Sequence, residues 1–397
     1  MTNDINLRAA TDDDTVLVTG ATGHVGGYSV AALLDHGYRV RVTLREPGQR
    51  DEVLARVRQA GADPDGRVDF HTVLLSADEG WAEAVDGARY VLHHASPFPF
   101  SPPEHEDELI RPAVDGTLRV LRAAREAGVR RTVLTSSYAA IGYSLKANDQ
   151  YSEADWTNPD EGLPAYHKSK TLAERAAWDF AREHDGFELS VVNPTGIFGP
   201  LLGPRLSAST GLIKGFMEGS SPVVPRMHFG VVDVRDVVDL HLRAMRHPAA
   251  AGERFIGVGG AAVSFLDLSR MIARHLPALA DRLPQRELSV DEVREGAKTE
   301  PALREAARLD GRIPVISNAK AREKLGWRPR PVAQTIADTA DSLVKLGLID
   351  PEGARRGSLP VGRPPVVAAG GRRRRVDGHP SPTGVSEGPC HRPCRAC

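Results

Sequence analysis

Short apolar runs of strand length alternate with segments of helical period along the first half of the chain. The runs are rich in β-branched residues and end at turn residues, whereas in the other segments apolar residues recur every three or four positions. The predicted strands cover residues 15–19, 38–44, 68–75, 89–94, 131–136 and 187–192, and the predicted helices cover residues 25–34, 51–60, 105–127 and 165–184. Strands and helices that alternate at this spacing predict an α/β fold, a doubly wound parallel sheet with helices on both faces.

Proline and glycine punctuate the chain beyond residue 193, and the regular alternation is lost there. We therefore expect a smaller, mixed α/β lobe after the sheet domain, with returns to the sheet near Val231 and Phe255. The expected boundaries are residues 15–193 for the sheet domain, about 231–258 for its return segment, and 194–230 together with 259–350 for the lobe. Helical periodicity resumes inside the lobe at residues 264–277 and 331–347.

The two ends of the chain differ from the rest in composition. Residues 1–14 and 351–397 lack periodicity and are mostly polar, so we expect both to be disordered. The overall formal charge of −1 conceals a basic tail, because residues 355–397 carry nine arginines against two acidic residues. All three cysteines also lie in that tail, so the rest of the chain has no thiol for a disulfide or a nucleophile.

The body of the chain shows none of the patterns that direct a protein out of the cytoplasm. The start has no apolar export segment, and no later stretch approaches the length of a membrane-spanning helix. The near-neutral total charge is not the footprint of a nucleic-acid-binding protein. We therefore expect a soluble, cytoplasmic protein, a monomer or a homodimer, that binds neither membrane nor nucleic acid.

A glycine-rich turn follows the first predicted strand directly and opens the first predicted helix. N–H groups at a helix N-terminus bind phosphate, while glycines allow a tight turn, a close backbone approach to phosphate and close packing of helix on strand. We therefore expect a dinucleotide pyrophosphate here, although glycine-rich turns also occur without a ligand. The residues expected to bind it are Gly20, Thr22, Gly23, His24, Val25 and Gly26.

An arginine follows the second predicted strand, where an enzyme that uses NAD presents an acid to the ribose 2′-hydroxyl. Leu44 ends this strand and Arg45 comes next. A guanidinium binds a 2′-phosphate with two parallel hydrogen bonds, whereas an acid would repel it. Arg45 therefore favours NADPH over NADH, with Arg50 as a second candidate contact. The competing interpretation is that Arg45 is an ordinary solvated arginine.

A tyrosine, a lysine and a serine suggest the chemistry. Tyr166 and Lys170 lie four residues apart on one face of a predicted helix, and Ser136 and Ser137 end a strand at the carboxyl edge of the sheet. Reduction of a carbonyl needs a proton donor and a dipole that binds the developing oxyanion. We expect Tyr166 to donate the proton, Lys170 to lower the pKa of Tyr166 and hold the ribose, and a serine hydroxyl to bind the carbonyl oxygen.

Several longer sequence words, in one order, resemble the extended short-chain dehydrogenase/reductases, in the branch of dihydroflavonol, cinnamoyl-CoA and methylglyoxal or ketone reductases. The words span about Thr15 to Leu348 and are VTGATGHVGG, VTLR, VLHHASPFPF, RPAVDGTLRVLRAA, VLTSSYAA, YHKSKTLAERAAWDF, NPTGIFGP, VDVRDVVDLH and KLGWRP. The resemblance implies a Rossmann-type domain that binds NADP and selects Ser137 over Ser136 as the catalytic serine. It also implies that Ala95, Ser96 and Pro97 border the nicotinamide and that Asn193 and Pro194 line the cofactor near its ring.

Three features depart from the resemblance. Leu74 and Leu75 stand where relatives usually carry Asp-Leu beside the adenine, and the tail after Asp350 has no counterpart. His24 stands in the glycine turn where an aromatic or aliphatic residue is common, and we expect it to add a pH-dependent charge near the phosphates.

Other polar clusters are given structural interpretations. We expect Asp233 and Asp236 to serve as helix caps and ion-pair partners rather than as catalytic acids. His93 and His94 form a polar strand end, and we expect no metal site there or at the tail cysteines Cys390, Cys394 and Cys397. The run Arg372–Arg375 is expected to be a solvated charge cluster.

Together these features predict an oxidoreductase that reduces a small, partly apolar ketone or aldehyde with NADPH. The expected substrate pocket is formed by Phe98, Phe100, Tyr138, Ile197, Phe198, Met227 and Phe229. The alternatives are a nucleotide-sugar epimerase or dehydratase with tightly bound NAD⁺, and a non-catalytic NADP-sensing regulator, against which the Tyr-Lys pair argues.

Overall fold

The computed structural model describes residues 6–9, 11, 14–97, 103–300 and 303–352, all within one compact unit, Met1–Pro360. Seven parallel strands form its main sheet in the order β12-β7-β5-β4-β1-β2-β3. Their bounds are β1 Thr15–Thr19, β2 Arg39–Leu44, β3 Val68–Thr72, β4 Tyr90–His93, β5 Arg131–Thr135, β7 Leu189–Pro194 and β12 Glu253–Gly257. The strand order reverses between β1 and β4, so the predicted doubly wound fold is confirmed.

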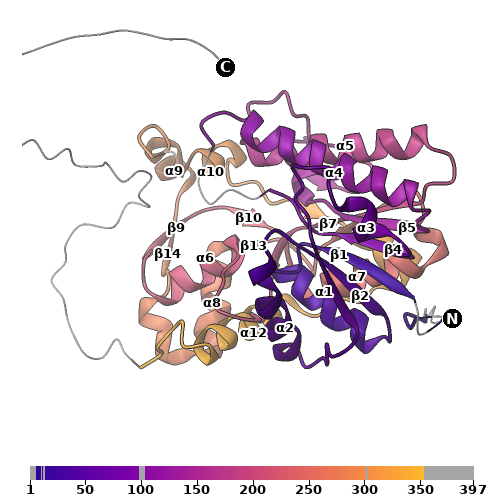
Figure 1. The fold of residues 1–397 in the computed structure, drawn as a ribbon. Helices are drawn as coiled ribbons and strands as arrows, with labels where there is room; N and C mark the ends of the chain where they lie inside the picture. The colour runs from indigo at the N-terminus through magenta and orange to yellow at the C-terminus, as the bar shows by residue number, and fades with distance from the viewer. Residues whose placement is uncertain (1–5, 10, 12–13, 98–102, 301–302, 353–397) are drawn as a thin grey trace, which may run out of the picture. The chain divides into compact units, whose positions relative to one another are not determined.

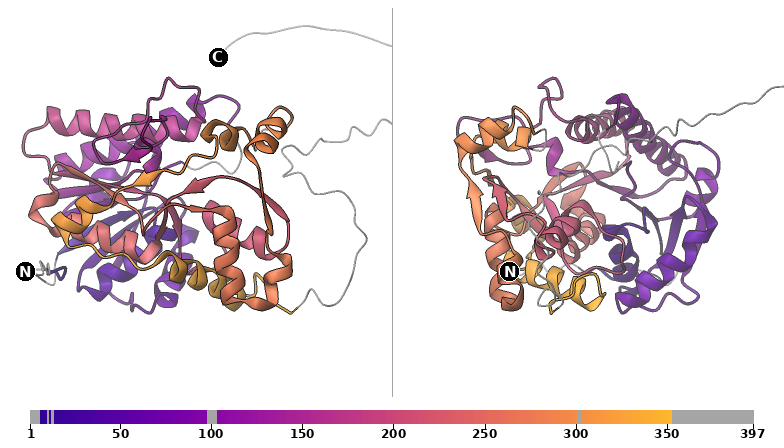
Figure 2. Two further views of the ribbon diagram at one scale, coloured as in Figure 1. Left: turned by 180° about the vertical axis from the view of Figure 1, so that it is seen from behind. Right: turned by 90° about the vertical axis from the view of Figure 1, so that its left-hand side faces the viewer.

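Helices cover both faces of this sheet (Figures 1 and 2). Side chains alternate between the faces along each strand, so Val16 and Val18 of β1 face one core and Leu17 faces the other. All three are fully buried, which explains why the strands are continuous apolar runs. The helices on the Val16 face are α1 His24–Asp35, α2 Arg50–Gln59 and α7 Val234–Arg246, and those on the Leu17 face are α3 Trp81–Val85, α4 Asp107–Glu126 and α5 Ala165–Glu183.

The third strand is shorter than predicted. We expected residues 68–75, and β3 ends at Thr72. Beyond it, the indole N–H of Trp81 donates to the carbonyls of Leu74 (3.0 Å) and Ala77 (3.1 Å), which holds the chain in a turn ahead of α3. Leu74 is consequently 43% exposed. The prediction extended the strand too far, because the hydrogen bonds from Trp81 hold residues 74–77 in a turn.

A second group of helices and short strands has an apolar core apart from those of the main sheet. Its apolar core includes Ile213, Leu268 and Ile336, one from each of its three longest helices, and each is fully buried. The remaining helices are α6 Ala208–Met217, α8 Phe265–His275, α9 Val290–Gly296, α10 Arg304–Leu309, α11 Ala319–Leu325 and α12 Val332–Lys345, and of these α11 packs into the core on the Val16 face of the main sheet. The short strands outside the main sheet are β6 Gln150–Tyr151, β8 Gly196–Phe198, β9 Val223–Pro225, β10 His228–Phe229, β11 Val231–Asp233, β13 Val263–Ser264, β14 Arg286–Leu288 and β15 Val315–Ile316. The 3₁₀ helices of the whole unit are Pro47–Gln49, Tyr138–Ala140, Pro248–Ala250 and Pro277–Arg282.

Only one of the two expected returns to the sheet occurs. β12, which contains Phe255, pairs with β7 at the edge of the main sheet. β11, which begins at Val231, pairs in parallel with β8 instead and forms a separate two-stranded sheet. The prediction that the chain returns to the main sheet near Val231 was wrong, because this apolar run pairs with β8, the short strand that follows β7.

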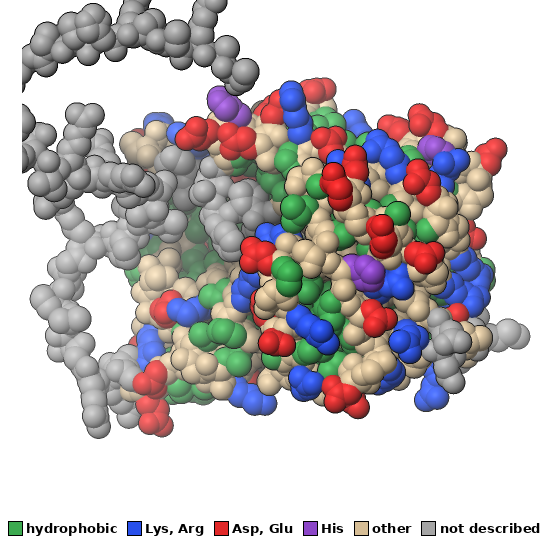
Figure 3. Space-filling view, viewed as in Figure 1, with side chains coloured by type: hydrophobic (Ala, Val, Ile, Leu, Met, Phe, Trp, Pro, Cys, Tyr) green, Lys and Arg blue, Asp and Glu red, His purple; other side chains and the backbone are tan. Residues whose placement is uncertain are grey.

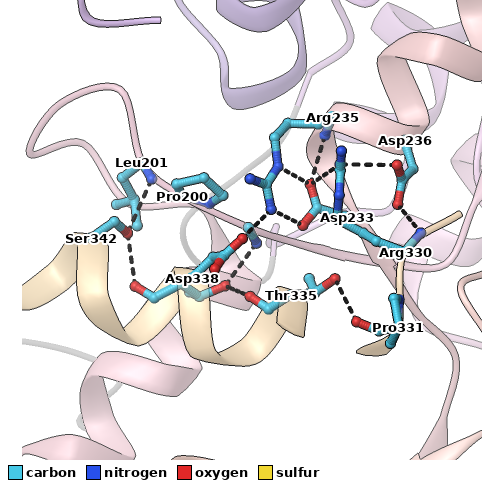
Figure 4. Close-up of polar contacts among 12 residues, drawn as sticks. Pro200, Leu201, Asp233, Arg235, Asp236, Arg330, Pro331, Thr335, Asp338 and Ser342 are labelled. Atoms are coloured by element: carbon cyan, nitrogen blue, oxygen red, sulfur yellow. Dashed lines mark hydrogen bonds and ion pairs between the residues drawn. The ribbon is translucent and has the colours of Figure 1, made fainter. Parts of the chain in front are cut away.

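Asp233 and Asp236 connect α7 to the last helix of the lobe (Figure 4). Asp233 caps α7 by accepting a hydrogen bond from the backbone N–H of Arg235 at 2.9 Å, and its carboxylate pairs with the guanidinium groups of Arg235 and Arg330. Arg235 also pairs with Asp338 of α12, while Arg330 lies 2.9 Å from the Asp236 carboxylate. Both carboxylates are buried, so these pairs satisfy them, and the predicted structural role is confirmed.

The described part of the chain start makes tertiary contacts. The backbone N–H of Ala9 donates to the carbonyl of His36 at 3.0 Å, and Asp14, which is 5% exposed, pairs with Arg89 at 2.7 Å. The predicted disordered tail lies almost wholly in residues 353–397, outside the described residues. Within the described part of the chain, no helix combines the length and apolar character needed to cross a membrane. On the face drawn in Figure 3, acidic and basic side chains are interspersed.

A chain of hydrogen bonds runs from His94 through Thr135 to His241, between the main sheet and α7. Nδ1 of His241 donates to the Val237 carbonyl at 2.7 Å, so its Nε2 accepts a hydrogen bond from Thr135 Oγ1 at 2.7 Å. Thr135 Oγ1 in turn accepts from Nδ1 of His94 at 2.7 Å. Burial lowers the pKa of His241 to about 4 and holds the pKa of His94 well below its usual value. Both rings are therefore neutral at pH 7 inside the folded protein.

We predict that these histidines make the fold acid-sensitive between pH 6.5 and 5. The unfolded chain binds protons there that the folded protein does not, so stability falls by about 1.4 kcal/mol per pH unit for each such histidine. In His241→Gln, the difference in unfolding free energy between pH 7 and pH 5, measured by urea titration, should be smaller than in the wild type. His105→Gln, at an exposed position, is the control and should keep the wild-type dependence. Identical pH dependence in all three proteins would contradict the prediction.

Candidate active site

The glycine turn places the N-terminus of α1 at the carboxyl edge of the sheet. Gly20 follows β1 and has a positive φ of 74°, and a Cβ there would lie 2.9 Å from the backbone N of Ala95. A Cβ on Gly26 would lie 2.3 Å from the Gly20 carbonyl oxygen. Gly23 is exposed and is the N-cap of α1, which has no side-chain cap and no acidic residue in its first turn. This open helix N-terminus fits an anionic phosphate, as the three glycines suggested.

His24 begins α1 but does not supply the expected charge. Burial lowers its pKa to about 4, although the nearby Asp233 acts in the opposite direction. Its ring lies edge-on to Tyr28, at 5.9 Å between centroids. The expectation of a pH-dependent charge near neutrality was wrong because the ring is packed into the protein, so His24 is neutral at pH 7.

Arg45 follows β2 as an exposed side chain. Its backbone N–H donates to Gln49 at 3.1 Å, but no ion pair engages its guanidinium within the described part of the chain. The guanidinium of Arg50, by contrast, lies over the ring of Phe70 at 5.2 Å from the centroid. Arg45 is therefore the arginine at this strand end that is available to an anion.

The loop after β4 is fixed to the glycine turn. The backbone N–H of Ala95 donates to Thr19 Oγ1 at 3.0 Å, and Thr19 Oγ1 lies 2.8 Å from Nδ1 of His93. Ala95, Ser96 and Pro97 are half-buried beside it. Among the described residues, no group of His, Cys, Asp or Glu side chains is arranged to hold a metal ion.

Tyr166 and Ser137 meet at the carboxyl edge of β5, and Lys170 follows Tyr166 on the same helix. α5 begins at Ala165, so Tyr166 and Lys170 lie one turn apart in its first turns. The Tyr166 hydroxyl donates to Ser137 Oγ at 3.5 Å, and Ser137 Oγ also accepts a hydrogen bond from the backbone N–H of Ala139 at 3.1 Å. The hydroxyl of Ser136 points elsewhere and donates to Glu174. Of the two serines, Ser137 is the one beside the tyrosine.

The electrostatics of this group differ from the expectation. Burial raises the pKa of Tyr166, and the hydrogen bond with Ser137 acts against that rise. Burial also lowers the pKa of Lys170 to about 8, which Glu174 partly opposes. We expected the Lys170 ammonium to lower the pKa of Tyr166, but in this structure the loss of solvation has the larger effect. At neutral pH the phenol is protonated and the lysine is charged.

A buried carboxylate that sequence analysis missed lies behind the triad. Glu174 is 0% exposed. Its Oε1 lies 2.7 Å from Arg254 Nε and accepts from the Trp178 indole at 3.2 Å, while its Oε2 accepts from Ser136 Oγ at 2.5 Å and Asn193 Nδ2 at 2.6 Å. The available signal was spacing, because Glu174 follows Lys170 by four residues on the same helical face.

Asn193 and Pro194 end β7 next to the triad, and both are buried. Nδ2 of Asn193 donates to the Ser137 carbonyl at 3.1 Å as well as to Glu174, while its Oδ1 is buried without a partner among the described residues. Asn193 therefore supports the backbone at Ser137. That both residues also contact a cofactor stays a prediction.

The predicted pocket residues do not all line one space. Tyr138 is 7% exposed and packs edge-on to Tyr151, and Phe198 is 1% exposed within the core of the lobe. Both are interior residues in this structure because their neighbours cover them. The others that the structure describes are half-buried, namely Ile197, Met227 and Phe229, whereas Phe98 and Phe100 lie outside the described residues.

Tyr143 and His167 were not predicted and lie next to Tyr166. Their rings are 3.9 Å apart between centroids, and the His167 ring is 5.8 Å from that of Tyr166. Burial raises the pKa of Tyr143, and the negative charge of Glu305 acts in the same direction. These side chains lie in a loop and at the start of α5, where periodicity gives no indication of which residue faces a site.

The chain and its fold are similar to known proteins. The NAD dependent epimerase/dehydratase family matches residues 16–259. The chain is 36% identical to a cinnamoyl-CoA reductase of Medicago truncatula over 246 residues, which cover 60% of this chain and 74% of the relative. It is 31% identical to the NADPH-dependent methylglyoxal reductase of Saccharomyces cerevisiae over 357 residues, which cover 84% of this chain and 98% of the relative.

A solved structure extends the likeness to three dimensions. The crystal structure of yeast methylglyoxal/isovaleraldehyde reductase complexed with NADPH matches with a TM-score of 0.70 at 28% identity. The match covers 84% of this chain and 99% of the yeast chain. The similarity therefore includes the second lobe as well as the main sheet.

We predict that Gly26→Ala disrupts the glycine turn. The added methyl would overlap the Gly20 carbonyl, so β1 and α1 must separate, and we expect a loss of about 1–3 kcal/mol in the free energy of unfolding. Gly211→Ala is the matched control, since this helical glycine has open space around its Cβ position, and alanine there should stabilise α6 by up to about 1 kcal/mol. Urea titration measures both, and equal stability of the two variants would refute the steric argument.

Proposed function

The chain belongs to the NAD dependent epimerase/dehydratase family, and from this premise we propose that it is an NADPH-dependent reductase that converts a ketone or aldehyde into an alcohol. The observation that carries the proposal is the contact of 3.5 Å between the Tyr166 hydroxyl and Ser137 Oγ, with Lys170 one turn further along α5. This group lies at the carboxyl edge of the sheet, where α1 also begins with its open N-terminus.

The residues around the glycine turn fit a dinucleotide. Backbone N–H groups in the first turn of α1 would bind the pyrophosphate, and Arg45 would bind a 2′-phosphate with its exposed guanidinium. Lys170 would hold the nicotinamide ribose, with Ala95, Ser96, Asn193 and Pro194 around the ring. When bound, NADPH supplies the hydride for the reaction. An arginine instead of an acid after β2 favours this assignment over an epimerase that retains NAD⁺.

The triad would manage the proton and the developing charge. Because burial keeps Tyr166 protonated at neutral pH, its hydroxyl donates a proton to the carbonyl oxygen of the substrate. The Ser137 hydroxyl donates a hydrogen bond to the same oxygen as negative charge develops on it. The Lys170 ammonium then stabilises the phenolate that remains on Tyr166.

The relatives support a carbonyl substrate. The cinnamoyl-CoA reductase and the methylglyoxal reductase are both named for the reduction of a carbonyl compound. The half-buried apolar side chains Ile197, Met227 and Phe229 favour a small to medium substrate with apolar surface. The cytoplasmic location and the oligomeric state, monomer or homodimer, stay predictions.

We predict that Tyr166→Phe lowers kcat for carbonyl reduction at least about 100-fold, because the proton donor is removed. The measurement is the loss of NADPH absorbance with a panel of aldehydes and ketones. Tyr90→Phe is the control, since this buried phenol accepts a hydrogen bond from Arg246 at 3.1 Å and belongs to β4, away from the triad. The mechanism fails if Tyr166→Phe turns over as fast as Tyr90→Phe.

We predict that Arg45→Ala weakens the use of NADPH selectively. Loss of a charge-assisted contact to the 2′-phosphate should raise the KM for NADPH about tenfold and leave the KM for NADH unchanged. Arg58→Ala serves as the control, because it removes an exposed arginine of α2 that pairs with Asp65. Equal effects of Arg45→Ala on the two cofactors would show that Arg45 is an ordinary surface arginine.

A further inference from the structure

We propose that Glu174 is a positioning residue of this site, which holds Ser137 through two hydrogen-bonded neighbours and serves as the counter-charge of Lys170. The proposal rests on the reductase function proposed above. Glu174 belongs to α5, one turn after Lys170 and two turns after Tyr166, so the three side chains share a face of the helix. Glu174 is the member of this series that solvent does not reach.

The two oxygens of the carboxylate have separate partners. Oε1 faces the body of the protein, with Arg254 Nε at 2.7 Å and the Trp178 indole at 3.2 Å. Oε2 faces the site, where it accepts from Ser136 Oγ at 2.5 Å and from Asn193 Nδ2 at 2.6 Å. A carboxylate that solvent does not reach needs partners at both oxygens, and the partners of Oε2 are the ones that connect it to Ser137. The second pair directs the carboxylate toward Ser137.

Both partners of Oε2 act on the backbone at Ser137. Ser136 is its direct neighbour in the chain, and the other N–H of Asn193 Nδ2 donates to the Ser137 carbonyl at 3.1 Å. Loss of either contact would let the strand end shift relative to α5. Because the Ser137 hydroxyl must point at the substrate oxygen, a small shift lowers kcat without changing cofactor binding.

The charges around Glu174 show why it matters for Lys170. Arg254 of β12 pairs with the carboxylate and stacks on Trp156 at 3.8 Å from the ring centroid. The other charged groups near this cluster are Glu153, which faces Arg254, and Arg175 of α5, while the neutral His93 of β4 lies near Lys170. Burial lowers the pKa of Lys170, and Glu174 is the charge that opposes this effect. Removal of that charge should favour the neutral lysine.

The test separates charge from hydrogen bonding with three variants. Glu174→Gln removes the charge, Glu174→Asp keeps the charge but shortens the reach, and Ser136→Ala removes one hydrogen bond to Oε2. Ser269→Ala is the control, because it removes a buried hydroxyl that donates to the Pro284 carbonyl at 2.7 Å, far along the chain in the lobe. Each protein is examined by urea titration, by steady-state kinetics, and by NMR of ¹³Cε-lysine without cofactor. The Lys170 signal is assigned among the eight lysines with Lys170→Arg.

We expect the Lys170 titration midpoint to fall by about one pH unit in Glu174→Gln and to keep its wild-type value in Glu174→Asp and Ser136→Ala. We expect kcat to fall about 10-fold to 100-fold in all three variants, and the KM for NADPH to stay unchanged in Glu174→Asp and Ser136→Ala, which keep the charge of Lys170. Ser269→Ala should lose stability and keep its kcat. An unchanged Lys170 midpoint in Glu174→Gln, or a kcat for Ser136→Ala equal to that of Ser269→Ala, overturns the proposal.

The two proposals fail in different ways. If the wild type reduces no carbonyl, or if Tyr166→Phe is fully active, the reductase function is wrong. The Lys170 titration needs neither cofactor nor turnover, so it still decides whether Glu174 sets the charge of the lysine. If the wild type is active and Tyr166→Phe is not, the kinetics of Ser136→Ala and Glu174→Asp decide the positioning role.

Discussion

The contact between the backbones at Gly20, Gly26 and Ala95 determines how the rest of the site is arranged. Side chains at the two glycines would meet backbone atoms at 2.9 Å and 2.3 Å, so β1, α1 and the loop after β4 approach each other without intervening atoms. This approach places the open N-terminus of α1 beside the reversal in strand order, where a crevice forms at the carboxyl edge. The open N-terminus of α1 and the end of β5 that carries Ser137 therefore share one edge because three backbone segments are in direct contact.

A second constraint is that the polar groups behind this edge are buried and must be satisfied internally. Glu174, Asn193 and Arg254 are each below 10% exposed and are joined by hydrogen bonds and an ion pair. Buried charge is tolerated only when it is paired, and pairing fixes the side chains in one arrangement. Between α7 and α12, Asp233 is likewise paired with Arg235 and Arg330, and Arg235 also pairs with Asp338 of α12. These ion pairs attach the lobe to the sheet domain, and because Asp233 is buried, solvent screens them only weakly.

The strands of the main sheet, the longer helices α1, α2, α4, α5, α8 and α12, and the proximity of Tyr166 to Ser137 were predictable because each depends on local patterns. Strand alternation and helical period are repeated many times along the chain, and Tyr166 and Lys170 are on one helical turn. The turn after β3 was not predictable, because Trp81 ends the strand from outside it. Glu174 was missed for a similar reason, since its partners Ser136, Asn193 and Arg254 come from three other strands or strand ends that only the fold brings together. The neutral state of His24 depends on packing, which residue identity does not reveal.

Arg254, the cation that pairs with Glu174, comes from a strand that lies much later in the sequence than the triad. The triad and its carboxylate are complete by residue 174, but β12, which carries Arg254, follows about eighty residues later and joins the sheet at its edge beside β7. Until that strand docks, Glu174 would be a buried charge without its cation, which is an expensive state. The arrangement around Glu174 is therefore complete only once β12 has paired with β7.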